Sequence, residues 1–246
     1  NLSFAADLYA TSDAELCEDC CESPEDIEAY EAEREKNRAL WERKAQSDPD
    51  ALENVVVRAI IGDRELHKSQ RVVLSSLRAG NSVLAVMATG RGKSLTFQVH
   101  AACEALAHHT ASLFVYPLRA LIADQAFHIN EALAPFGINA CTLTGESAPD
   151  ERRQVFAGLR DGSVDIVLTT PEFLVCHAPE FAATDRIGFV VVDEAHHIGL
   201  SRAGHRPAYA QLGSTIAQMG NPVVLALTAT SDEAVTSDID RVLPVA

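Results

Sequence analysis

The stretch SVLAVMATGRGKS, residues 82–94, decides the fold. A short apolar run leads into a loop that contains Gly90 and Gly92, and a helical pattern starts directly after it. Glycines in such a loop let backbone N–H groups turn toward phosphate oxygens, and the following helix adds its positive N-terminal end. Lys93 is placed to reach the β- and γ-phosphates of a nucleotide, and Ser94 to ligate Mg²⁺. The stretch therefore predicts a phosphate-binding loop between a strand and a helix.

Short apolar runs alternate with helical segments over the rest of the chain. Continuous apolar strands separated by helices predict a doubly wound parallel sheet with helices on both faces, so we expect an α/β fold of the P-loop NTPase class. The strands are expected at 82–88, 111–117, 140–145, 164–170, 187–193 and 222–230, and the helices near 93–107, 118–135, 149–160, 171–182 and 207–219. Such sheets bind ligands at the carboxyl ends of their strands.

The segment VVVDEAHHI, residues 190–198, ends the fifth apolar run. It brings Asp193 and Glu194 to the carboxyl edge of the sheet, where a phosphate-binding loop needs an acidic partner. We expect Asp193 to hold Mg²⁺ and Glu194 to polarise the attacking water, so that both act in catalysis together with Lys93. Three further residues are expected to couple this site to the neighbouring motifs: His196 and, at the end of the sixth run, Thr228 and Thr230.

The acidity of the chain is concentrated at its N-terminal end. Residues 1–53 hold 16 Asp or Glu and 5 Lys or Arg, whereas residues 54–246 hold 19 and 15, within a formal net charge of −15. We therefore predict an acidic arm over 1–53 and one ATP-binding domain over 54–246. Pro24 and Asp26 favour a helix over 23–46 that SDPD at 47–50 ends. The charge argues against a large basic surface for duplex binding, so any contact with nucleic acid must be local, and the acidic arm is best explained as a solvated face.

The cysteines and the hydropathy indicate a cytoplasmic protein without a membrane segment. Cys103, Cys141 and Cys176 sit singly in apolar stretches and are predicted to be small core residues in a reducing compartment. The C-x-x-C-C cluster at 17–21 offers three thiols, whereas a structural zinc site needs four ligands, so we expect no metal there. No stretch reaches the ~18 apolar residues that a membrane span requires.

Together these motifs resemble those of superfamily 2 helicases of the DEAH-box kind, and of RecQ-like DNA helicases in particular, over about residues 66–231. The resemblance implies a first RecA-like motor domain that uses ATP and Mg²⁺. It implies that Gln70, in LHKSQ, reads the adenine, and that Thr89 joins the two glycines of the loop in holding the nucleotide. The matching stretches are LHKSQ (66–70), MATGRGKSLTFQ (87–98), PLRALIADQ (117–125), TTPE (169–172) and HRPAYAQLG (205–213).

Two departures from the family pattern bear on DNA binding and on catalysis. The stretch GLSRAGHR, residues 199–206, has no Trp or Phe where the family has an aromatic-rich segment. Arginines would then have to replace base stacking. The second RecA-like domain, with its arginine finger, is expected outside residues 1–246, so the chain alone should be nearly inactive. The predicted DNA contacts are Arg119, Thr170, Arg202 and Arg206.

The function that follows is an ATP-dependent DNA helicase, whose motor couples ATP hydrolysis to movement along single-stranded DNA and to unwinding of partly duplex DNA. Two alternatives stay open at this stage. One is an RNA helicase, or a translocase that does not unwind, of the same fold. The other is a nucleotide-binding regulatory module without turnover, against which the intact Lys93, Asp193 and Glu194 argue.

Overall fold

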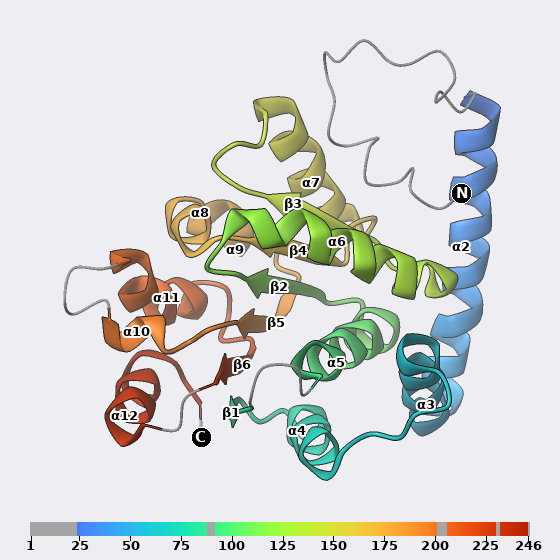
Figure 1. Ribbon diagram of the computed structural model, residues 1–246. Helices are drawn as coiled ribbons and strands as arrows, with labels where there is room; N and C mark the ends of the chain where they lie inside the picture. The colour runs from blue at the N-terminus through green and yellow to red at the C-terminus, as the bar shows by residue number, and fades with distance from the viewer. Residues whose placement is uncertain (1–23, 88–91, 201–205, 230–231, 246) are drawn as a thin grey trace.

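A six-stranded parallel sheet forms the centre of the protein (Figure 1). The computed structural model describes residues 24–87, 92–200, 206–229 and 232–245. The strand order is β1-β6-β5-β2-β4-β3, and every neighbouring pair is parallel. The strands are β1 (Val83–Val86), β2 (Ala111–Val115), β3 (Ala140–Leu143), β4 (Ile166–Thr169), β5 (Ile187–Val192) and β6 (Val223–Thr228). All six strands predicted from the apolar runs are confirmed.

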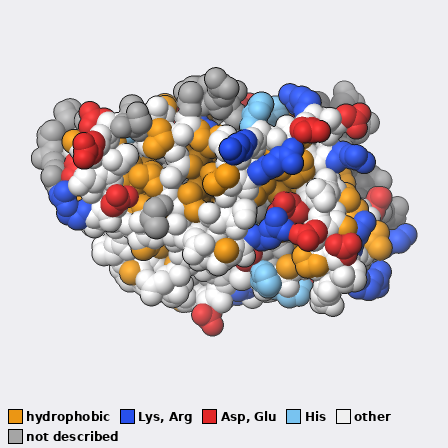
Figure 2. Space-filling model, turned by 90° about the horizontal axis from the view of Figure 1, so that it is seen from below, with side chains coloured by type: hydrophobic (Ala, Val, Ile, Leu, Met, Phe, Trp, Pro, Cys, Tyr) orange, Lys and Arg blue, Asp and Glu red, His pale blue; other side chains and the backbone are white. Residues whose placement is uncertain are grey.

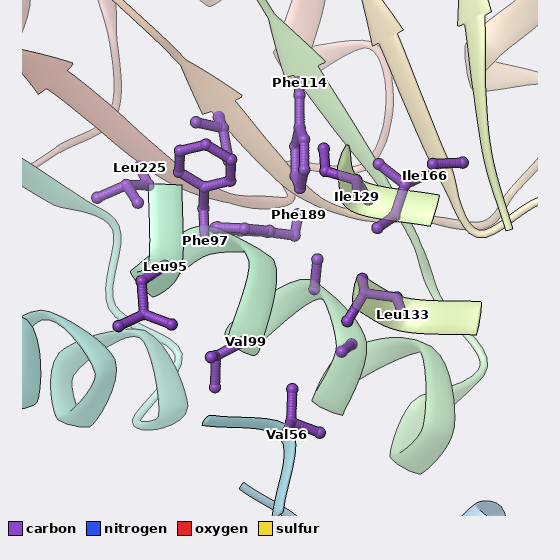
Figure 3. Packing of buried hydrophobic residues seen from close by; sticks show 14 of the residues in the cluster. Val56, Leu95, Phe97, Val99, Phe114, Ile129, Leu133, Ile166, Phe189 and Leu225 are labelled. Carbon is purple, nitrogen blue, oxygen red and sulfur yellow. The ribbon is translucent and has the colours of Figure 1, made fainter. Parts of the chain in front are cut away.

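Helices cover both faces of this sheet because alternate side chains of each strand point to opposite sides. On β2, Phe114 packs in one core cluster with α5, whereas Leu113 and Val115 pack in the other. Figure 3 shows the first cluster, where the rings of Phe97 and Phe114 meet edge to face with centroids 4.8 Å apart. The predicted doubly wound α/β architecture is therefore confirmed.

The helices that follow the strands lie close to their predicted positions. They are α5 (Lys93–His108), α6 (Arg119–Leu133) with the short η1 (Ala134–Phe136), α7 (Pro149–Asp161), α8 (Pro171–Cys176), α9 (Ala178–Ala182) and α11 (Pro207–Ala217). Four others were not predicted: α3 (Pro49–Ile61), α4 (Lys68–Arg78), α10 (His197–Leu200) and α12 (Glu233–Val242). Of the three cysteines expected in the core, Cys141 is buried and Cys103 partly buried, but Cys176 is exposed. That prediction was wrong because Cys176 ends the short surface helix α8.

The helix predicted in the arm is α2 (Pro24–Ser47), and it lies along one side of the domain (Figure 1). Its Arg38 donates from Nη1 to both carboxylate oxygens of Asp165, at 2.8 and 2.9 Å, and Asp165 is fully buried beside β4. SDPD ends α2 as expected, but Asp48 also caps the start of α3 by accepting from Ala51 N. The division expected at residues 53 and 54 falls inside α3, which packs on α5. The boundary between arm and domain stays a prediction.

The face that carries α3, α4 and α12 is mixed in character (Figure 2). Hydrophobic side chains gather near its middle, and acidic and basic side chains are interspersed beside them. Val72 on α4 and Val86 at the end of β1 are exposed hydrophobic residues, at 59% and 44%. None of the described helices combines the length and the apolar character that a membrane span requires.

Candidate active site

The start of α5 positions Lys93 and Ser94 of the predicted phosphate-binding loop. β1 ends at Val86, and Lys93 and Ser94 are the first two residues of the helix, so their backbone N–H groups lie at its positive end. Gly92 caps the helix with φ +68°, a left-handed conformation that favours glycine. A Cβ there would meet Gln70 Nε2 at 2.7 Å, so the Gln70 side chain would have to shift. Thr89 and Gly90 lie outside the described residues.

The acidic pair lies directly opposite this lysine, at the end of β5. Lys93 Nζ is 3.4 Å from Glu194 Oε1 and 4.0 Å from Asp193 Oδ1. Glu194 has φ +49°, an uncommon conformation for a non-glycine residue, and its N–H donates to Asp193 Oδ1 at 2.9 Å. The structure therefore brings together the three residues predicted to carry catalysis, although 100 residues of chain separate Lys93 from Asp193.

Burial affects the charge of Asp193. Partial burial raises the pKa of the Asp193 carboxyl above its ordinary value, and the positive charge of Lys93 opposes that rise. When a carboxylate is partly removed from water beside an ammonium group, any further cation close by stabilises its charged form. The arrangement can therefore hold a divalent cation and the negative phosphates that accompany it.

Strand β6 lies between the two loops and is bonded to both. Met87 N donates to Thr228 O at 2.9 Å, and Ala195 N donates to Leu227 O at 2.7 Å. His196 Nδ1 lies 3.1 Å from Glu194 Oε2, without hydrogen-bond geometry. The positions of His196 and Thr228 next to the acidic pair agree with the coupling roles expected for them, which stay predictions. Thr230 lies outside the described residues.

Gln70 connects the loop before α4 with the start of α5. Its Oε1 accepts from His67 N at 2.7 Å, and its Nε2 donates to Gly92 O at 3.0 Å, while the side chain is 97% buried. A carboxamide both donates and accepts hydrogen bonds, which is the chemistry that an adenine edge requires. The predicted adenine contact stays a prediction, but the residue does lie against the loop.

The residues predicted to contact DNA do not all present free side chains. Arg119 at the start of α6 pairs with the exposed Glu146. Thr170 is buried and caps α8 by accepting from Phe173 N at 3.3 Å. Arg206 donates from Nη1 to Pro117 O and therefore ties the segment before α11 to the end of β2. Arg202 lies outside the described residues, and the DNA strip as a whole stays a prediction.

Two tyrosines that the sequence did not single out lie close to Asp193. Tyr209 on α11 is fully buried and its hydroxyl donates to Asp193 O at 3.4 Å. Tyr116 follows the last residue of β2 and is also buried. The strand order, which places β2 next to β5, brings Tyr116 close to Asp193, whereas Tyr209 approaches from α11.

A loop of the phosphate-binding kind and an acidic pair that meet at the carboxyl edge of a parallel sheet define the class of P-loop nucleoside triphosphatases. Within that class, the chain belongs to the DEAD/DEAH box helicase family, whose sequence pattern matches residues 67–238.

Several helicases are similar in sequence to this chain. The ATP-dependent DNA helicase RecQ of Haemophilus influenzae is 33% identical over 196 residues, which are 78% of this chain and 30% of the relative. The protein of the same name from Pasteurella multocida is 35% identical over 196 residues, 76% of this chain and 28% of the relative. The resemblance to RecQ-like helicases is therefore confirmed, and the chain spans less than a third of the length of these two relatives.

Solved structures support the fold. The DUF1998 helicase MrfA bound to DNA and AMPPNP has a TM-score of 0.63 at 21% identity, and the match covers 76% of this chain and 28% of MrfA. A hypothetical ATP-dependent RNA helicase from Sulfolobus tokodaii has a TM-score of 0.57 at 21% identity, covering 77% of this chain and 54% of that one. At these identities the likeness establishes the RecA-like helicase fold alone.

Proposed function

We propose that this chain is the ATP-binding motor domain of a RecQ-like DNA helicase that works in the cytoplasm. In the whole protein it couples ATP hydrolysis to movement along single-stranded DNA and to unwinding. The observation that carries the proposal is the meeting of Lys93 Nζ with Glu194 and Asp193, at 3.4 and 4.0 Å. The similarity to RecQ helicases supports DNA as the substrate.

The described residues fit Mg²⁺·ATP by charge and by chemistry. Lys93 and the first N–H groups of α5 offer positive charge to phosphate oxygens. Ser94 and Asp193 are oxygen donors of the type that Mg²⁺ prefers, and they belong to the two segments that meet at this edge. Gln70 carries the amide donor and acceptor that recognition of an adenine edge requires.

The reaction needs four things: phosphates held in place, a metal ion, a positioned water and neutralisation of the developing charge. Mg²⁺·ATP, when bound, supplies a terminal phosphoryl group for transfer to water. Lys93 leaves its contact with Glu194 to hold the phosphates, which frees the Glu194 carboxylate to accept a hydrogen bond from the attacking water. The fourth requirement is assigned to an arginine of a second RecA-like domain, outside residues 1–246.

The DNA contacts belong to the same proposal. Arg119, Thr170, Arg202 and Arg206 follow the ends of β2, β4 and β5 in the chain, in motifs that face the strand in the family. A strip with so few positive charges should bind single-stranded DNA weakly, and added salt should weaken that binding further.

Calorimetric titration of the chain with Mg²⁺·ADP tests the nucleotide site. The wild-type chain and Glu194→Gln should bind with similar affinity, whereas Lys93→Ala should show no binding. Equal binding by wild type and Lys93→Ala would remove the basis of the proposal. Since loss of an arginine finger costs roughly 10³–10⁵ in rate, residues 1–246 tested apart from the proposed second domain should turn over ATP far more slowly than about 1 s⁻¹. Preference for single-stranded RNA over DNA in a filter-binding comparison would favour an RNA-directed motor instead.

A further inference from the structure

A buried hydroxyl next to the acidic pair has no hydrogen-bond partner. Tyr116 is 4% exposed, and among the described residues none bonds to its hydroxyl. Ser112, four residues earlier and on β2, has the same property. A buried hydroxyl without a partner costs about 1–3 kcal/mol, so a protein gains stability whenever such a group is removed. A group that persists despite this cost needs another explanation.

The position of Tyr116 supplies a candidate partner. Val115 of β2 pairs with Val192 of β5, and Asp193 N donates to Val115 O at 3.0 Å. Tyr116 and Asp193 are the residues that follow this pair on the two neighbouring segments. Tyr116 packs in the core cluster on the α5 face, as does Val191, two residues before Asp193. Because side chains alternate along a strand, continuation of that pattern places both side chains on the face from which Lys93 approaches.

The chemistry of the two groups is complementary. Burial and the neighbouring charge of Asp193 raise the pKa of the Tyr116 phenol, so it stays protonated and is a hydrogen-bond donor. The contacts of Asp193 with Glu194 N and with Lys93 both use Oδ1, so neither engages Oδ2. Nucleotide phosphates compete for Lys93, and Asp193 then needs another donor that keeps it charged and oriented.

Resting on the function proposed above, we propose that Tyr116 is a positioning residue of the nucleotide site. In the Mg²⁺·nucleotide-bound state its hydroxyl donates a hydrogen bond to the Asp193 carboxylate, and the bond fixes that carboxylate for the metal. Partners of this kind, one shell outside a metal, typically change metal affinity 10- to 100-fold when they are lost. The hydroxyl thus costs stability in the free chain and contributes to binding only when metal and nucleotide are present.

The test compares Tyr116→Phe with the matched control Ser112→Ala, since each removes a single buried hydroxyl without a partner among the described residues. Both variants should raise the midpoint of thermal unfolding of the free chain, by about 2–4 °C. ADP affinity is then measured by calorimetry in excess Mg²⁺ and in EDTA. Tyr116→Phe should weaken binding about tenfold in Mg²⁺ and less than about twofold in EDTA. Ser112→Ala should change neither affinity.

Each other outcome overturns the inference in a distinguishable way. An unchanged Mg²⁺-dependent affinity in Tyr116→Phe means that the hydroxyl does not act on Asp193. Equal weakening in Mg²⁺ and in EDTA means that the ring only supports the loop. A lower unfolding midpoint for Tyr116→Phe means that the hydroxyl has a partner in the free chain. If the wild-type chain binds no nucleotide in either condition, the proposed function fails first, and this inference fails with it.

Discussion

Replacing Arg38 by Met removes a cation from a buried ion pair and retains an unbranched, apolar side chain. Asp165 is fully buried and accepts two bonds from the guanidinium, and Asn139 N also donates to its carboxylate at 3.0 Å. Removal of one partner of a buried pair typically costs about 3–5 kcal/mol, because the remaining charge is left without compensation. The bond from Asn139 relieves part of that cost, so we expect about 3 kcal/mol for Arg38→Met.

Urea unfolding followed by circular dichroism measures this change in the free energy of unfolding. The matched control is Arg71→Met, since Arg71 pairs with Glu65 on the surface, where the side chains are 60% and 88% exposed. An exposed pair contributes about 0–1 kcal/mol. Adding Asp165→Asn to Arg38→Met should recover part of the loss. If Arg38→Met costs no more than Arg71→Met, helix α2 is not held by this pair, and the reasoning about the arm is wrong.

Four further predictions concern the nucleotide, pH, metal and DNA. Gln70→Ala should weaken ATP binding more than UTP binding in competition titrations, and equal losses would contradict adenine recognition. Burial lowers the pKa of His100 to about 4, below the unfolded value of about 6.5. The unfolded chain therefore binds more protons between these values, and stability falls as the pH drops through that window. His100→Phe should lose less stability than wild type between pH 7 and pH 5 in thermal melts. The C-x-x-C-C cluster at 17–21 lies outside the described residues, and elemental analysis of the purified chain should find no zinc. Stoichiometric zinc that disappears in Cys17→Ser would contradict that expectation. An Arg119→Ala/Arg206→Ala variant should bind single-stranded DNA more weakly and with a shallower salt dependence, and unchanged binding would argue against the strip.

The strands were predictable because continuous apolar runs with β-branched residues have few other uses in a chain of this length. Helices α3 and α4 were not. VVV at 55–57 resembles a strand, and SDPD, which ends α2, also starts α3 through the Asp48 cap. The same four residues therefore carry two opposite signals, and the sequence alone does not separate them.

The chemistry of the site was predictable where it depends on strand ends, since Lys93, Asp193 and Glu194 all follow apolar runs and must share one edge of the sheet. What was not predictable depends on strand order. Nothing in the sequence says that β2 lies beside β5, so neither the approach of Tyr116 to Asp193 nor the bond from Arg206 to Pro117 was expected. Neighbours across strands follow from tertiary topology rather than from local pattern.

The end of β6 has a mechanical consequence for the whole edge. Thr228 O accepts a hydrogen bond at 2.9 Å from Met87 N, just before the phosphate-binding loop. Leu227 O accepts one at 2.7 Å from Ala195 N, just after the acidic pair. Both are ordinary backbone hydrogen bonds, so a displacement of the main chain at 227–228 moves both halves of the site or breaks one of the bonds. A displacement of the segment that follows β6 is therefore transmitted to both loops at once. The distance between Lys93 and Asp193 would report such a displacement.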